Sequence, residues 1–247
     1  GYGDVRELAR AARARRRHIS ETRAARTLSP DATSRQPIAQ DYGGGGDYDP
    51  GPAWTMIEDI AGVEKFVAED ELEPAIIGFF NEDTHGDEIE KYQEVANSHR
   101  YDFRFAYTTE DDVREHFKFK GWAVLVYQPT RFTSDKYDRP KARYPARTIS
   151  PDSLGKFIYQ KSVPLVGQRT WKSADRYDKI GLPVVTLFTK IDHEKNRKGD
   201  DYFANRLRRV ADEFKGKLSF NIGDKDDFSY LLADYDLDLP HKQDGGV

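Results

Sequence analysis

The sequence predicts an α/β protein in which helices cover the faces of a mixed sheet. Short apolar segments rich in β-branched residues, such as Ala75–Phe80, alternate along the chain with segments whose apolar residues recur at helical spacing. Alternating units of this kind are typical of sheets packed against helices. A chain of 247 residues, with 37% hydrophobic and 33% charged residues, has room for one large or two small domains.

The first run of elements occupies about residues 53–162. Within it, Phe103, Phe105 and Tyr107 alternate with other residues, which predicts a strand with one buried face. Ser150 followed by Pro151 predicts the start of a helix. We expect strands at 56–57, 75–80, 103–107, 122–127 and 144–149, and helices around 63–67, 87–97, 109–117 and 150–158. The resulting order, β-α-β-α-β-α-β-β-α, is that of the thioredoxin fold.

A second, similar run of elements begins after residue 165. We expect strands at 166–170, 182–191 and 218–222, and helices at 174–179, 201–215 and 228–233. The chain then stops, so the last two strands and the last helix of this fold are expected to be missing. Without the fourth strand, Val184–Phe188 would expose the edge of an apolar central strand. We therefore expect residues 165–247 to be only marginally folded on their own.

These patterns predict a thioredoxin-like fold with one complete redox-inactive domain, followed by a second, truncated thioredoxin-like domain. The expected boundaries are 1–50 for an arginine-rich tail and glycine-rich linker, 51–164 for the complete domain and 165–247 for the truncated one.

The residues that would carry redox chemistry in this fold are missing. Thioredoxin-fold oxidoreductases place a Cys-x-x-Cys pair after the second strand, where the N-terminus of a helix lowers the thiol pKa. Those positions hold Asn81–Thr84 in the first domain and Thr189–Asp192 in the second, and the chain contains no cysteine. Gly121 and Trp122 stand where the redox-active fold has a proline before its fourth strand. Disulfides, thiol catalysis and cysteine-ligated metals are thus excluded within this chain.

Residues 1–40 differ in composition from the rest of the chain. They hold nine arginines and four acidic residues, which gives a net charge of +5. Because the whole chain has a net charge of −4, the remaining residues carry −9. The run Arg13–Arg17 could bind nucleic acid or an anionic surface. A disordered tail, or sequence foreign to the parent protein, is the favoured interpretation because aromatic stacking residues are almost absent. We expect no nucleic-acid partner and no membrane span, and both ends are expected to be internal to a longer protein.

The histidines and the acidic clusters predict no metal site, and no cofactor is expected. The six histidines have no short paired spacing of the kind that metal ligands show. His193 lies between Asp192 and Glu194, but neighbours in a loop rarely converge on one ion. Asp224–Asp227 lacks the alternation and the terminal glutamate of a calcium loop, so a charged turn before the next helix is favoured.

The stretch from Leu182 to Phe214 combines a buried strand, an irregular charged loop and an amphipathic helix. Its segments Asp192–Gly199 and Tyr202–Arg206 resemble the b′ domain of the protein disulfide isomerase family, nearest to the 57-kDa class of glycoprotein-folding members. The resemblance continues upstream through Ile76–Phe80, Tyr101–Tyr107 and Ile158–Gly167. It covers about residues 51–247, and it does not cover residues 1–40.

The resemblance implies a location, partners and a binding site. The location is the lumen of the endoplasmic reticulum, and the partners are unfolded glycoprotein clients and the acidic P-domain of calnexin or calreticulin. Three basic positions of the family that dock the P-domain match Lys136, Lys198 and Arg206, although Arg139 and Pro140 alter the segment after the first of these. By this interpretation the chain is the non-catalytic docking region of a protein disulfide isomerase.

Two other functions are compatible with the sequence. One is a general module that binds unfolded clients through an apolar surface of the second domain, without specificity for the lectin chaperones. The other is a nucleic-acid or membrane tether formed by the arginine-rich tail.

Overall fold

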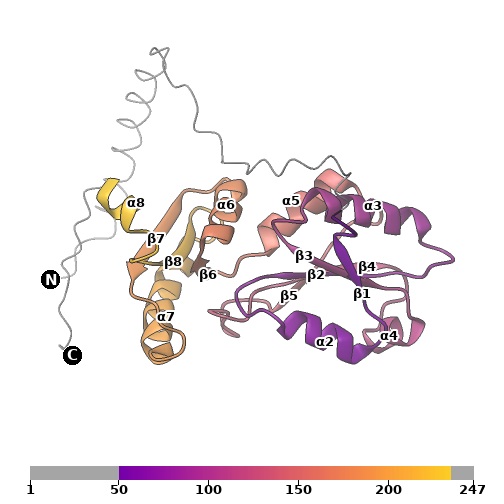
Figure 1. The fold of residues 1–247 in the computed structure, drawn as a ribbon, viewed down its shortest axis with the longest axis horizontal. Coiled ribbons are helices and arrows are strands. Elements are labelled where there is room, and N and C mark those ends of the chain that lie inside the picture. The colour runs from indigo at the N-terminus through magenta and orange to yellow at the C-terminus, as the bar shows by residue number, and fades with distance from the viewer. Residues whose placement is uncertain (1–49, 235–247) are drawn as a thin grey trace, which may run out of the picture. The chain divides into compact units, whose positions relative to one another are not determined.

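The first part of the structure is built around a five-stranded mixed sheet (Figure 1). The computed structural model describes residues 50–234, and these all lie within one compact unit. The strand order is β1-β3-β2-β4-β5; β1 and β2 are parallel to β3, whereas β4 is antiparallel to both β2 and β5. The elements of this first domain are β1 (Trp54–Met56), α2 (Ile60–Ala68), β2 (Ala75–Phe79), α3 (Gly86–Ser98), β3 (Arg104–Thr108), α4 (Asp111–His116), β4 (Ala123–Tyr127), β5 (Lys141–Arg143) and α5 (Pro151–Lys161).

The second part is a smaller, three-stranded parallel sheet with the order β6-β8-β7. Its elements are β6 (Val166–Arg169), α6 (Trp171–Ile180), β7 (Val184–Thr189), α7 (Arg197–Glu213), β8 (Ser219–Asp224) and α8 (Ser229–Asp234). This order repeats β1-β3-β2 of the first sheet, which confirms the predicted fold and its internal repeat. Among residues 50–234, β7 has no strand on its outer edge, where its counterpart β2 pairs with β4.

β2 and β7 differ in burial because they differ in strand pairing. All five residues of β2 are buried, because strands flank it on both edges and helices cover both faces. No residue of β7 is fully buried, and Val185 is exposed. The apolar composition of β7 is therefore only partly used in packing, as expected for a sheet edge.

Two apolar cores lie on opposite faces of the first sheet. Tyr92 of α3 is fully buried on one face, and its hydroxyl lies 2.7 Å from the carbonyl oxygen of Ala106 and 3.0 Å from that of Ile76. It thereby ties α3 to both β2 and β3. Burial raises the pKa of Tyr92 well above its ordinary value, so this hydroxyl remains a donor. Val63 of α2 and Val113 of α4 fill the core of the other face.

Some predicted element boundaries were wrong. The edge strand lies at Lys141–Arg143 rather than at 144–149, since Tyr144 and Ile149 turn inward and are buried in the core. The helix predicted at 201–215 begins at Arg197, because its polar first turn carries no apolar periodicity. The arginine-rich tail, most of the linker 41–50 and the last thirteen residues lie outside the described residues, and the predicted domain boundaries stay a prediction.

Phe132 of the first domain belongs to the core of the second. It lies in the loop after β4, is 2% exposed, and packs with Val166, Ala204, Ala211, Phe220 and Ile222. Its φ of 64° lies in the left-handed region, which costs a non-glycine residue about 1–2 kcal/mol. The contacts of the ring and the carbonyl group offset this strain, because the Arg208 guanidinium donates to the Phe132 carbonyl oxygen.

A second set of contacts joins α6 to the first domain. The Arg176 guanidinium is 2% exposed, donates to the carboxylate of Glu73 and to the backbone carbonyl of Asp102, and lies 4.9 Å from the centre of the Phe103 ring. Glu73 is also buried. Loss of one partner from such a buried pair leaves an uncompensated charge and costs about 3–5 kcal/mol.

A partly exposed cluster of Asp102, Tyr159 and Lys179 extends this contact. The Tyr159 hydroxyl donates to the Asp102 carboxylate at 2.6 Å, and the Lys179 ammonium lies 2.7 Å from Tyr159 and 3.2 Å from Asp102. Burial alone raises the pKa of Asp102, but the hydrogen bonds from Tyr159 and Lys179 outweigh it, and the net pKa lies below its usual value.

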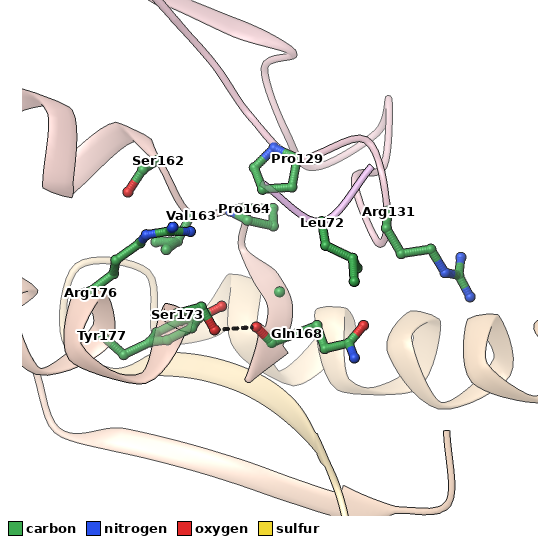
Figure 2. A pocket seen from close by; sticks show the side chains of 11 residues that line it. Leu72, Pro129, Arg131, Ser162, Val163, Pro164, Gln168, Ser173, Arg176 and Tyr177 are labelled. Atoms are coloured by element: carbon green, nitrogen blue, oxygen red, sulfur yellow. Dashed lines mark hydrogen bonds between the residues drawn. The ribbon is translucent and has the colours of Figure 1, made fainter. Parts of the chain in front are cut away.

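A small cavity lies between the contacts of the Phe132 loop and those of Arg176 (Figure 2). Pro129, Pro164 and Leu72 line it on the apolar side, and Gln168 and Ser173 on the polar side. The Ser173 hydroxyl donates to the Gln168 backbone carbonyl at 2.8 Å and also takes part in the capping box with Thr170 at the start of α6.

Replacing Phe132 by alanine is expected to destabilise the second domain by about 3–5 kcal/mol, because the substitution empties part of its core. The measurement is native-state hydrogen exchange, in which the amides of β8 should lose protection while those of β2 serve as an internal reference. Unchanged protection of β8 in Phe132→Ala would contradict the assigned role of this ring.

Asp102 is expected to make the stability depend on pH in the acidic range. Its folded-state pKa is lowered, so its contribution is complete above the unfolded-state pKa of about 3.9 and is lost as the pH falls through the lower folded value. Asp102→Asn removes this contribution, so the difference in melting temperature between the original chain and the variant should shrink between pH 6 and pH 3. A difference that stays constant over this range would argue against the cluster.

Candidate functional site

The position where a thioredoxin-fold oxidoreductase has its cysteines is a hydrogen-bonded turn in the first domain. Asn81 follows β2, and its side chain accepts from the backbone N–H of Thr84 at 3.1 Å and donates to Asp111 at 3.2 Å. The backbone N–H of Asn81 donates to the His85 imidazole at 2.9 Å. The side chains that shape this turn are occupied with each other, and none of them is a thiol.

The corresponding position of the second domain is also a closed turn. The Asp192 carboxylate accepts from the backbone N–H groups of Glu194 and Lys195 at 3.2 and 2.9 Å, ahead of α7. The Asp224 carboxylate accepts from Ile191 at 2.7 Å and from Asp226 at 2.7 Å. Asp224 therefore organises a turn before α8, as predicted for this acidic segment.

Lys136 lies on an exposed turn that follows β4. Asp138 closes the turn by accepting from the backbone N–H of Ser134 at 2.9 Å, and its other carboxylate oxygen accepts from Leu165 at 2.7 Å. The turn is thus tied to the chain where it enters the second domain. The Lys136 ammonium lies 4.8 Å from the centre of the Tyr137 ring.

Lys198 and Arg206 are both exposed on α7. Arg206 lies eight positions after Lys198, which corresponds to about 12 Å along the helix axis and about 80° around it. Tyr202 lies between them, and the Arg206 guanidinium lies 4.3 Å from the centre of its ring. Across the described part of the chain, none of the three predicted cations forms an ion pair with an acidic side chain.

The structure brings the loop that carries Lys136 against the helix that carries the other two cations. Arg131, at the start of this loop and 4% exposed, donates to Asp201 of α7 at 2.7 Å and lies 3.7 Å from Asp200. From the other side, buried Arg208 of α7 donates to the carbonyl of Phe132. Burial lowers the pKa of Arg208, yet this group remains charged because its ordinary pKa is so high.

His193 belongs to this contact and bonds to residues other than its sequence neighbours Asp192 and Glu194. Its Nδ1 lies 3.0 Å from the Arg131 Nε and 3.1 Å from the Asp200 carboxylate, and its Nε2 lies 2.6 Å from the Gln168 side-chain oxygen. The ring joins the first-domain loop to α7 and β6. Within residues 50–234, no group of three or more histidine, aspartate or glutamate side chains is arranged to hold a metal ion.

A second exposed feature is an aromatic cluster between α6 and α8. Trp171 is 63% exposed and stacks on Tyr230, with ring centres 5.4 Å apart and an interplanar angle of 11°. Buried Phe228 lies beneath, 5.1 Å from Trp171, and the Arg169 guanidinium lies 5.6 Å from its ring centre.

The sequence model of a family described as 'Thioredoxin-like domain' matches residues 81–242, which is more than half of the chain. The chain belongs to the thioredoxin-like domain family. The likeness to solved structures agrees on the fold: the crystal structure of the bb fragment of ERp72 superposes with a TM-score of 0.64 at 23% identity, covering 79% of this chain and 82% of that one.

Relatives of this thioredoxin-like chain include protein disulfide isomerases. It is 28% identical over 191 residues to protein disulfide-isomerase A3 of Gallus gallus, covering 76% of this chain and 37% of that protein. It is 27% identical over 190 residues to protein disulfide-isomerase A4 of Bos taurus, covering 76% and 28% of the two chains. The chain therefore spans about a third of the length of these relatives, and it contains no cysteine.

The part of the thioredoxin-like chain that the structure describes contains no helix long and apolar enough to cross a membrane.

Arg131, Phe132, Asp200 and Arg208 were not singled out in the sequence, although they fix the geometry of the site. The signal that could have found two of them is local. Asp200 and Arg208 lie on the apolar side of the helical wheel of α7, where a charged residue needs a buried partner. Nothing in the local sequence identifies the partner, because Arg131 and Phe132 are about 70 residues away.

Proposed function

We propose that this chain is the non-catalytic docking region of a protein disulfide isomerase, and that Lys136, Lys198 and Arg206 bind the acidic tip of the P-domain of calnexin or calreticulin. The observation that carries the proposal is that three exposed cations, which have no acidic partner within residues 50–234, lie on two elements held together by buried contacts. The role of each cation rests on the resemblance of its surrounding segment.

The physical basis is electrostatic recognition by rigid elements. Separate cations attract a flexible acidic hairpin over several ångströms and then form charge-assisted hydrogen bonds with its carboxylates. The buried Arg131 contact removes the entropy cost of bringing the loop and α7 together at the moment of binding. Arg206 is also oriented in advance by its stacking on Tyr202.

The wider role rests on the protein disulfide isomerase relatives. The parent protein would form and rearrange disulfides of unfolded glycoproteins in the lumen of the endoplasmic reticulum, with cysteines supplied by other domains. This chain would supply spacing and partner recognition, since without cysteine it has no thiol to exchange.

Calorimetric titration with a calreticulin P-domain tests the docking site. Lys198→Ala/Arg206→Ala is expected to weaken binding at least tenfold, because two charge-assisted contacts are lost, and Lys136→Ala is expected to weaken it about threefold to tenfold. Raising the salt concentration should weaken binding by the original chain sharply.

The matched control is Lys120→Ala/Lys156→Ala, which removes two exposed positive charges of the first domain elsewhere. It should bind nearly as well as the original chain, with the folds of all variants compared by circular dichroism. Equal weakening by the control and by the docking variant would mean that net charge alone, rather than this site, governs binding.

The aromatic cluster favours a second candidate function, a general module for unfolded clients. Trp171 and Tyr230 present a stacked apolar surface, and exposed aromatic surface of this kind is enriched at sites that bind other chains. No acidic partner is required for such binding, so it should depend little on salt.

Under this second function, Trp171→Ala is expected to weaken the binding of a reduced and alkylated, permanently unfolded protein by about fivefold to thirtyfold, because Trp171 is the more exposed of the two stacked rings. Fluorescence anisotropy at low and at high salt measures the effect. Binding that is abolished by salt and unaffected by Trp171→Ala would reject this function.

A further inference from the structure

The solvent-facing side of α7 carries apolar residues as well as cations. Tyr202 is 51% exposed, Phe203 is 38% exposed and Val210 is 36% exposed. Three of the eight large apolar side chains that are exposed in residues 50–234 thus come from this one helix. An ordinary solvated helix face has no need of them, because packing of α7 already uses its opposite face through Ala204 and Ala211.

These side chains are arranged in a mixed stripe along the helix. At 100° per residue, Lys198, Tyr202, Arg206 and Arg209 fall within an arc of about 80° on the exposed face. Phe203 and Val210 form an apolar shoulder about 40–60° beyond Arg206. Orientation of Arg206 accounts for Tyr202, but it does not account for the exposed Phe203 and Val210 beside it.

The stacking at the centre of the stripe is ordered. The Arg206 guanidinium lies 4.3 Å from the Tyr202 ring centre, within the range of a cation–π contact. The Tyr202 and Phe203 rings meet edge to face, with centres 5.4 Å apart and an interplanar angle of 82°. The aromatic group is therefore held in place from two directions, while half of the Tyr202 surface remains open to a partner.

We propose that Tyr202 is a specificity-determining residue of the docking surface, and that the partner is an acidic segment with an aromatic side chain next to its carboxylates. The carboxylates bind Lys198 and Arg206, and the aromatic side chain packs on Tyr202 and the shoulder formed by Phe203 and Val210. This inference rests on the proposed function and adds an apolar determinant to its ionic one. Aromatic anchors framed by charged contacts provide much of the affinity of such interfaces.

Two synthetic acidic peptides test the inference with the full 247-residue chain. Both have the same length and the same number of carboxylates, and they differ only in one central residue, tryptophan in one and alanine in the other. The original chain is expected to bind the tryptophan peptide about fivefold more tightly. In Tyr202→Ala this preference should disappear, while a salt-dependent affinity for both peptides remains.

Three further variants separate the effect of the Tyr202 ring from that of another exposed tyrosine and from that of the cations. Tyr202→Phe should retain the preference, because it keeps the ring, and Tyr101→Ala should retain it because it removes an exposed tyrosine outside α7. Lys198→Ala/Arg206→Ala should lose affinity for both peptides. Circular dichroism and melting temperature verify that each variant is folded.

The outcomes distinguish this inference from the proposed function. Equal affinity of the original chain for the two peptides, a preference that survives in Tyr202→Ala, or binding of neither peptide would overturn the role of Tyr202. A preference that depends on Tyr202, together with no binding of the calreticulin P-domain, would support the aromatic determinant and reject the proposed partner.

Discussion

The insertion of Phe132 into the second core is the contact on which the remaining geometry depends. A loop of the complete domain supplies a ring to a neighbour whose sheet has three described strands. The backbone accepts a left-handed conformation at a phenylalanine so that the ring can point into that core. Arg131 and Arg208 then hold the loop from both sides, and these contacts offset the cost of the unfavourable conformation.

This construction fixes the spacing of charges that lie far apart in the sequence. Lys136 stands four residues after the inserted ring, and Lys198 and Arg206 stand on the helix that receives it. A binding surface shared between two domains is precise only where their relative position is fixed, and buried ion pairs give such precision because few other arrangements satisfy them. Within residues 50–234, Lys136, Lys198 and Arg206 are therefore free of acidic partners, while buried Arg131 and Arg208 hold the two elements that carry them.

The elements of this fold could be predicted, whereas the contacts between its two halves could not. The strands and helices follow from local apolar periodicity, and the order β6-β8-β7 follows from its likeness to β1-β3-β2. Boundaries failed where polar residues open a helix, as at Arg197, or where buried residues follow an edge strand, as at Tyr144. The positions of Lys136, Lys198 and Arg206 came from resemblance, and their exposure agrees with a surface role while their binding stays a prediction. The burial of Phe132 was not predicted, because an aromatic residue in a polar loop belongs to no periodic apolar pattern.

The same inserted ring has a consequence for the order in which the chain folds. Strands β6 and β8 are neighbours in the sheet but about 50 residues apart in the sequence, so closing them is intrinsically slow. During synthesis the first domain emerges earlier, and domains of this size fold as units. We expect the finished first domain to act as a template that offers Phe132 as a preformed part of the second core.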